Sequence, residues 1–175
     1  MSTTIDGSAS VTINSGAVLG ITSGTAVAST SGTSIDFTGI PSWVKRITVM
    51  FNGVSVSASS IIQVQLGTGS TSYTTSGYVG GGWYANTTNT VVTTGIPVIA
   101  SGAGAGARTV TGTMTIANIT GNTWVASATI FEVTGSGCLS ASSIALGAVL
   151  TAVRITTVNG TDTFDAGTIN IMYEG

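Results

Sequence analysis

The sequence predicts an all-β fold, an antiparallel β-sandwich of jelly-roll-like form that carries an extended N-terminal arm. Three observations predict it: apolar and polar residues alternate along most of the chain, turn-forming pairs separate the alternating segments, and helical signals are weak. Many short strands joined by frequent turns are typical of sandwiches and jelly rolls. We place the arm at residues 1–32 and the sandwich domain at residues 33–175.

The arm is predicted from short apolar segments that alternate with Gly and Ser in residues 1–32. Such a segment is either a flexible leader or an arm that pairs with a neighbouring subunit. We favour the arm, because the segment is apolar enough to require burial and its strands are too short to be stable alone. The residues expected to make assembly contacts are Val11, Ile13, Val18, Leu19 and Ile21.

The clearest predicted strand lies at residues 108–117. One face carries threonine at alternate positions from residue 109 to residue 115, and the other carries Val110, Met114 and Ile116. We expect half-buried strands of this kind to turn their polar faces, including Gln63 and Gln65, towards water or a partner. The other strands predicted from the pattern are residues 35–37, 45–51, 62–66, 139–150, whose spacing also fits a helix, and 169–173.

Turn signals separate these strands. Asn159-Gly160 predicts a two-residue hairpin between residues 149–158 and 161–164, because both central residues of a type I′ turn need positive φ. Gly121-Asn122 predicts a second hairpin, and Asn52-Gly53 predicts either a turn or a bulge. Ile40-Pro41 predicts the end of the strand at residues 35–37, since proline cannot donate to a ladder.

The composition excludes several kinds of chemistry. Charged residues make up 6% of the chain, with four basic and six acidic residues and no histidine, whereas soluble domains carry about 25%. A His-based catalytic triad and the usual zinc sites are therefore excluded, and Cys138 has no histidine to activate it, so we interpret it as a small buried hydrophobe. We expect no catalytic residue, no cofactor and no metal. The few cations also disfavour binding to nucleic acid.

The chain shows no convincing membrane segment or signal peptide. Its longest apolar stretch, residues 144–153, is much shorter than the roughly 20 residues that span a bilayer. The first residues lack the basic region and apolar core of a secretion signal. We therefore expect no membrane insertion and synthesis in a cytoplasm, and a single cysteine agrees with a reducing compartment.

Two acidic residues lie close together near the predicted Asn159-Gly160 hairpin. Paired carboxylates are the catalytic groups of glycosidases, so Asp162 and Asp165 are candidates for that chemistry. A calcium site is a weaker candidate, because the segment offers few oxygen ligands. We favour a third interpretation, in which both aspartates cap turns by accepting hydrogen bonds from backbone N–H groups.

The segment at residues 80–86 is the most suggestive loop. Three glycines are expected to make it mobile, and Trp83, Tyr84 and Asn86 follow them. Adjacent aromatic rings are costly to expose without a purpose. The rings are candidates for contact with a receptor or a sugar; alternatively, Trp83 or Tyr84 packs on a neighbouring subunit or in the core.

Residues 33–55, which read TSIDFTGIPSWVKRITVMFNGVS, resemble a module that recurs in tail-fibre-like and appendage proteins of tailed bacteriophages. Two further pieces fit the same pattern, VQLG at residues 64–67 with TTSGY at residues 74–78, and GTDTFDAGTINIMYE at residues 160–174. The resemblance implies a non-enzymatic structural protein of the virion, displayed on the particle surface as a fibre-like appendage of the head or the tail.

The same resemblance implies a homotrimer that is made in the host cytoplasm and resides in the virion. Its partners would be other virion proteins of the capsid or tail, with a host-surface glycan as a further candidate. The chain has no shaft and little room for a tail-anchoring domain, so a head fibre or a capsid-decorating (cement) protein is an alternative. Alternatives of other classes are a polysaccharide-degrading appendage enzyme and a bacterial surface adhesin, the latter disfavoured by the missing secretion signal.

Overall fold

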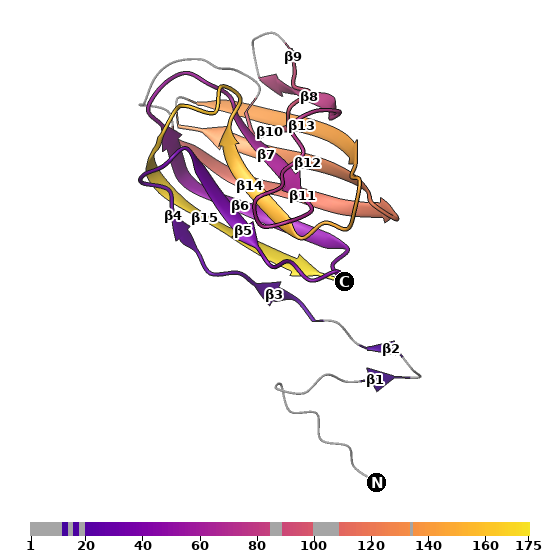
Figure 1. Cartoon of the computed structure of the whole chain (residues 1–175). Helices are drawn as coiled ribbons and strands as arrows, with labels where there is room; N and C mark the ends of the chain where they lie inside the picture. The colour runs from indigo at the N-terminus through magenta and orange to yellow at the C-terminus, as the bar shows by residue number, and fades with distance from the viewer. Residues whose placement is uncertain (1–11, 14–15, 18–19, 85–88, 100–108, 134) are drawn as a thin grey trace.

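The protein is an antiparallel β-sandwich, as the sequence predicts. The computed structural model describes residues 12–13, 16–17, 20–84, 89–99, 109–133 and 135–175, and the regular structure within these ranges is all β. A four-stranded sheet lies in front of a nine-stranded sheet (Figure 1). A jelly roll joins two Greek keys of eight strands in total, and sheets of four and nine strands do not confirm that form of the prediction.

The nine-stranded sheet has the order β3-β15-β6-β11-β12-β13-β8-β9, and β4 also pairs with β15. Its strands are β3 (Thr22–Ser23), β4 (Val27–Ala28), β6 (Arg46–Val56), β8 (Val79–Tyr84), β9 (Thr90–Val91), β11 (Val110–Thr120), β12 (Thr123–Glu132), β13 (Ser136–Ala145) and β15 (Phe164–Glu174). The four-stranded sheet has the order β10-β7-β14-β5. Its strands are β5 (Ser34–Thr38), β7 (Ile62–Gly67), β10 (Ile96–Pro97) and β14 (Ala152–Thr157).

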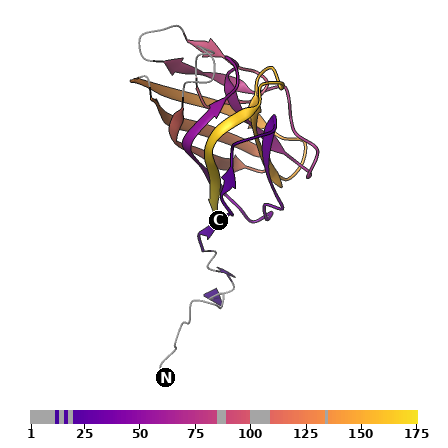
Figure 2. The same ribbon diagram turned by 90° about the vertical axis from the view of Figure 1, so that its left-hand side faces the viewer.

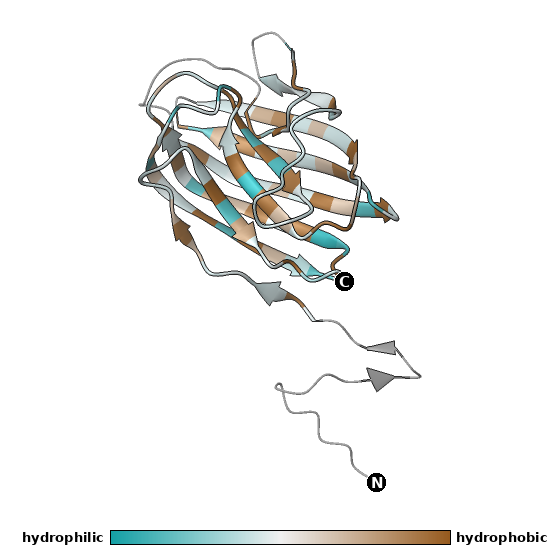
Figure 3. Cartoon of the chain, viewed as in Figure 1, coloured by the Kyte–Doolittle hydropathy of each residue, from teal (hydrophilic) through white to brown (hydrophobic). Residues whose placement is uncertain are grey.

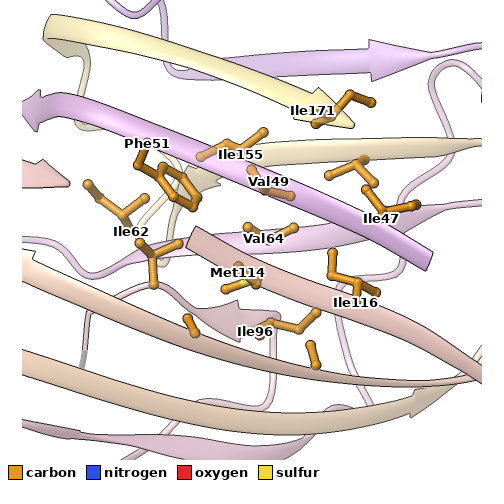
Figure 4. Close-up of a cluster of buried hydrophobic side chains, with 14 of the residues drawn as sticks. Ile47, Val49, Phe51, Ile62, Val64, Ile96, Met114, Ile116, Ile155 and Ile171 are labelled. Atoms are coloured by element: carbon orange, nitrogen blue, oxygen red, sulfur yellow. The ribbon is translucent and has the colours of Figure 1, made fainter. Parts of the chain in front are cut away.

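The core lies between the two sheets and follows from the alternation of apolar residues along the long strands (Figure 3). Val110, Met114 and Ile116 of β11 are all buried, while the threonines between them point to the opposite side. Figure 4 shows that side chains from both sheets, such as Val49 of β6 and Ile155 of β14, meet in one cluster. Cys138 is buried in this core, as predicted.

Three turn predictions are confirmed. Gly121 and Asn122 join β11 to β12 in a hairpin, in which Thr120 pairs with Thr123. The strand at residues 35–37 ends before Pro41, because β5 stops at Thr38. Asn52-Gly53 forms a β-bulge rather than a turn, since the register between β11 and β6 shifts there and Gly53 has a φ of 62°.

The hairpin predicted at Asn159-Gly160 is wrong. A tight turn does form, with the amide of Gly160 donating to the carbonyl of Thr157 at 3.0 Å. However, β14 before it belongs to the four-stranded sheet and β15 after it to the nine-stranded sheet. Turn residues specify a local reversal of the chain but not the partner of the next strand, and here the turn carries the chain from one sheet to the other.

The prediction that β7 turns a polar face towards water or a partner is also wrong. Gln63 and Gln65 are buried, with exposed fractions of 1% and 7%. The segment around Thr94 covers them: the Gln65 amide donates to the Thr94 carbonyl at 2.9 Å, and the Thr94 hydroxyl donates to Gln63 Oε1 at 2.8 Å. The glutamines thus exchange water for hydrogen bonds within the chain. The strand predicted at residues 139–150 is confirmed as far as Ala145, where β13 ends.

Part of the predicted arm belongs to the sandwich. Within residues 1–32, β3 and β4 pair with β15, and Ser29 is fully buried, its hydroxyl donating to the Ala166 carbonyl at 2.8 Å. Residues 22–29 therefore form an edge of the nine-stranded sheet. The preceding strands, β1 (Thr12–Ile13) and β2 (Gly16–Ala17), pair with each other, and Figures 1 and 2 both show them beyond one end of the sandwich.

A buried tyrosine links the segment before β8 to the four-stranded sheet. The Tyr78 hydroxyl accepts a hydrogen bond from the backbone amide of Leu66 at 2.8 Å, and its side chain is fully buried. Burial raises the pKa of Tyr78 to about 12, because the phenolate would lose its solvation.

We expect this tyrosine to make the fold sensitive to alkaline pH. The unfolded chain loses the proton near pH 10 and the folded chain near pH 12, so the stabilisation is complete below pH 10 and is lost as the pH rises through 12. The loss amounts to about 2–3 kcal/mol. Urea unfolding at pH 9 and pH 11.5 measures most of this loss. Tyr78→Phe should weaken this pH dependence, and a parallel decline in both proteins would contradict the assignment.

Candidate interaction surface

The side of the nine-stranded sheet that faces away from the four-stranded sheet presents a continuous surface, which we call the outer face. Its strands pair in register, so outward side chains line up in rows across the sheet. One row contains Met50, Thr113, Thr129, Leu139 and Trp83. The next row contains Thr48, Thr115, Ser127, Ala141, Gly81 and Val91.

Large apolar side chains gather at one end of the outer face, on the neighbouring strands β12, β13, β8 and β9. We call this group the apolar end; it consists of Val79, Trp83, Val91, Phe131 and Leu139. Each is exposed, Trp83 at 52% and Leu139 at 49%. Trp83 and Leu139 are direct register partners. Exposed apolar side chains that gather in this way are typical of an interaction site.

A hollow of about 420 Å³ lies within the apolar end, and Trp83, Leu139 and Val91 are among the residues that line it. Gly81 and Ala141 also line it and are cross-strand partners between the larger side chains. A Cβ at Gly81 would lie 2.3 Å from the Thr90 carbonyl oxygen, so only glycine allows β9 to approach β8 this closely. The glycines expected to make a mobile loop instead pack two strands together, and residues 79–84 form β8.

The predicted contact residues separate across the sheet. Strand alternation turns Trp83 outward and Tyr84 inward, where Tyr84 is 7% exposed and donates a hydrogen bond to Glu132 Oε2 at 2.5 Å. Tyr84 is therefore not a contact residue of this surface, and its side chain packs in the core, which was the alternative to receptor contact. Asn86 lies outside the described residues. Neighbouring residues of a strand face opposite sides, so predicting residues 79–84 as a strand would also have predicted that Trp83 and Tyr84 point in opposite directions.

The predicted assembly residues fall mostly outside the described part of the chain. The structure does not describe Val11, Val18 and Leu19, and Ile13 belongs to β1. Ile21 is 65% exposed, beside β3. Backbone hydrogen bonds join this segment to β15, for example from the Gly24 amide to the Ile171 carbonyl at 2.8 Å.

Ionic side chains lie on both sheets. Arg154 of β14 donates to both carboxylate oxygens of Asp36 at 2.8 and 2.7 Å, and its guanidinium carbon lies 4.0 Å from the centre of the Tyr73 ring. The hydrogen bond to Asp36 raises the pKa of Arg154, and burial together with the Asp36 charge raises the pKa of Tyr73. Arg46 and Glu174 form an ion pair where β6 begins and β15 ends, on the outer face, in the row next to that of Thr48.

The two aspartates near Asn159-Gly160 both accept hydrogen bonds within the fold. Asp162 Oδ2 accepts a hydrogen bond from the Ser60 amide at 2.9 Å, and its Oδ1 accepts one from the Asn159 side chain at 2.6 Å. Asp165 accepts a hydrogen bond from the Ser55 hydroxyl. The backbone contact of Asp162 agrees with the turn-capping interpretation, whereas Asp165 lies in β15 and contacts a side chain of β6, so the interpretation does not describe it. Within the described ranges, no group of three or more His, Cys, Asp or Glu side chains could hold a metal ion.

Comparison of the chain with protein-family models, with curated proteins and with solved structures finds no match. No helix of the described segments is long and apolar enough to cross a membrane.

Proposed function

We propose that the chain is a non-enzymatic structural protein of a bacteriophage virion, displayed on the particle surface as a homotrimer. One observation carries the proposal: the molecule has two distinct ends. β1 and β2 extend beyond the end of the sandwich where β15 finishes, and β8 and β9 lie at the opposite end (Figures 1 and 2). A protein attached through its N-terminal segment would hold the apolar end away from the particle.

The N-terminal segment is suited to attachment. Its last part is fixed to the sandwich through β3, β4 and Ser29, while the apolar Ile21 is exposed at 65%. An apolar segment anchored at one end gains stability by packing against a neighbouring subunit or another virion protein. The resemblance of residues 33–55 to appendage modules of tailed phages supports the same role.

The scarcity of charge also supports an assembled rather than a freely diffusing protein. Only 6% of the residues are charged, and net charge is a principal means by which free proteins stay dispersed. A subunit inside an assembly buries part of its surface and depends less on charge. The structural hydrogen bonds of Asp162 and Asp165, the candidate carboxylate pair, favour this role over a polysaccharide-degrading enzyme.

Cryo-electron microscopy of purified source particles tests the proposal. We expect density for the sandwich on the particle surface, with residues 1–32 facing the particle. Hundreds of copies per particle would indicate the capsid-decorating alternative, and a handful would indicate a tail or head appendage. Absence of the chain from purified particles would refute the proposal, and loss of a polysaccharide-degrading activity in Asp162→Ala would favour the enzyme.

A further inference from the structure

We infer that the outer face of the nine-stranded sheet is the surface on which copies of this chain pack against one another, with Trp83 as its anchor. The inference rests on the proposed homo-oligomer and names its contact surface, which the sequence did not identify.

The first argument is the distribution of charge. Cyclic oligomers place each subunit around a rotation axis, where a side chain meets copies of itself. A charge near that axis would meet like charges, which is strongly unfavourable. The two central rows of the outer face, which continue onto β15 at Asn170 and Met172, contain hydroxyl, amide, small and apolar side chains without a charged group. The Arg46–Glu174 ion pair lies in the adjacent row, where the two opposite charges neutralise each other, so the two central rows can approach their own copies without like-charge repulsion.

The second argument is that the opposite side of the sandwich is already occupied. The four-stranded sheet carries the Asp36–Arg154 ion pair on its outer side, with the Tyr73 ring against the guanidinium. The segment around Thr94 covers Gln63 and Gln65 on the same sheet. Of the two sheets, the nine-stranded one thus retains the uncovered surface, with the Arg46–Glu174 ion pair at its β6–β15 corner.

The third argument is area. Six neighbouring strands of the nine-stranded sheet, from β15 to β8, are six to eleven residues long. At a strand spacing of about 4.8 Å and a rise of about 3.4 Å per residue, they span roughly 29 Å by 30 Å, or about 900 Å². A stable protein interface buries about 800 Å² on each partner. The outer face is therefore large enough to hold two copies together.

The apolar end supplies the anchor. Tryptophan is enriched among the few residues that dominate binding energy, particularly where other apolar side chains surround it and exclude water. Leu139 is the register partner of Trp83 and Val91 lines the same hollow, while Phe131 lies on β12, on the far side of β13. The outer face has a second hollow, of about 280 Å³, in addition to the hollow of about 420 Å³ at the apolar end. Thr115 and Ser127 are among the residues that line it. The face therefore offers two concave places for side chains of a partner copy.

Light scattering of the full-length chain after size exclusion, over a range of concentrations, tests the inference. The wild type should have a mass that is a multiple of the 17.3 kDa monomer. Leu139→Glu places like charges on the face and should raise the dissociation constant at least about 100-fold. Trp83→Ala should raise it by about 30-fold or more. Both residues are exposed at about half of their surface, so neither change should prevent folding, which thermal unfolding checks.

Val158→Glu is the matched control. Val158 is exposed at 42% and lies beside a hollow lined by Gln63 and Arg154 of the other sheet, so the same charge should leave the mass unchanged. A monomeric wild type, or an oligomer that neither outer-face variant weakens, would overturn the inference. A monomer that binds a neutral glycan and loses it in Trp83→Ala would overturn it in favour of a sugar site. These outcomes do not depend on whether virus particles contain the chain. Microscopy of purified particles answers that question and so tests the proposed function separately.

Discussion

Replacing Gly167 with alanine will lower the free energy of unfolding by about 2–5 kcal/mol. Two effects add at this position. Gly167 has a φ of 95°, a conformation that residues with a Cβ adopt at a cost. An added Cβ would also lie 2.5 Å from both the carbonyl carbon and the carbonyl oxygen of Gly53, and backbone atoms cannot move aside as the end of a flexible side chain can.

The site explains why such close contact exists. Gly53 lies in the bulge of β6, and the pairing of β15 with β6 shifts register on either side of Ala166. The two paired strands therefore approach each other closely at this point, and a glycine on each strand, Gly53 on β6 and Gly167 on β15, allows the approach. Urea unfolding monitored by tryptophan fluorescence would measure the loss of stability.

Gly160→Ala is the control for this prediction. Gly160 has a φ of 69°, but a Cβ there would meet no atom within 4 Å. The free energy of unfolding should fall only by the cost of placing a residue with a Cβ at positive φ, about 1–2 kcal/mol. Equal losses in the two variants would show that the contact with Gly53 contributes nothing.

The sequence predicts those parts of the fold that depend on local pattern. The alternation in β11 and the turn at Gly121-Asn122 each involve neighbouring residues, so their periodicity and φ requirements are visible in the chain. The turn at Asn159-Gly160 is visible in the same way, but the choice between two sheets for β15 depends on pairing with β6, more than a hundred residues away. The burial of Gln63 likewise depends on Thr94, which no local pattern connects to it.

The candidate surface shows the same division. Trp83 is conspicuous in the sequence because glycines precede it, but Leu139 and Phe131 are ordinary members of alternating strands. Strand register brings them together: Leu139 pairs with Trp83, and Phe131 lies on the adjacent β12. The sequence did contain a sign of this surface, because Phe131 and Leu139 occupy positions of their strands at which the alternating pattern predicts polar residues. The arm differs, because whether β3 and β4 pair with β15 depends on a free sheet edge and not on the arm's composition.

Removing a core side chain from the smaller sheet should have the second large effect. Ile155 is fully buried on β14, between β5 and β7, and lies near Val49 and Phe51 of the other sheet (Figure 4). Ile155→Ala should lower the free energy of unfolding by about 2–5 kcal/mol, and Ile155→Val by about 0.5–1.5 kcal/mol, since each deletes buried methyl groups and leaves a cavity.

The shape of the transition is as informative as its midpoint. Residues of both sheets form one buried cluster, so the four-stranded sheet has no separate core with which to remain folded. We therefore expect Ile155→Ala to unfold in a single urea transition, with fluorescence and circular dichroism coinciding, at a lower midpoint than the wild type. Val158→Ala, which changes an exposed side chain just after the same strand, should stay within about 0.5 kcal/mol. Two separate transitions in Ile155→Ala would mean that the larger sheet is stable without its partner, and that the sandwich is two units rather than one.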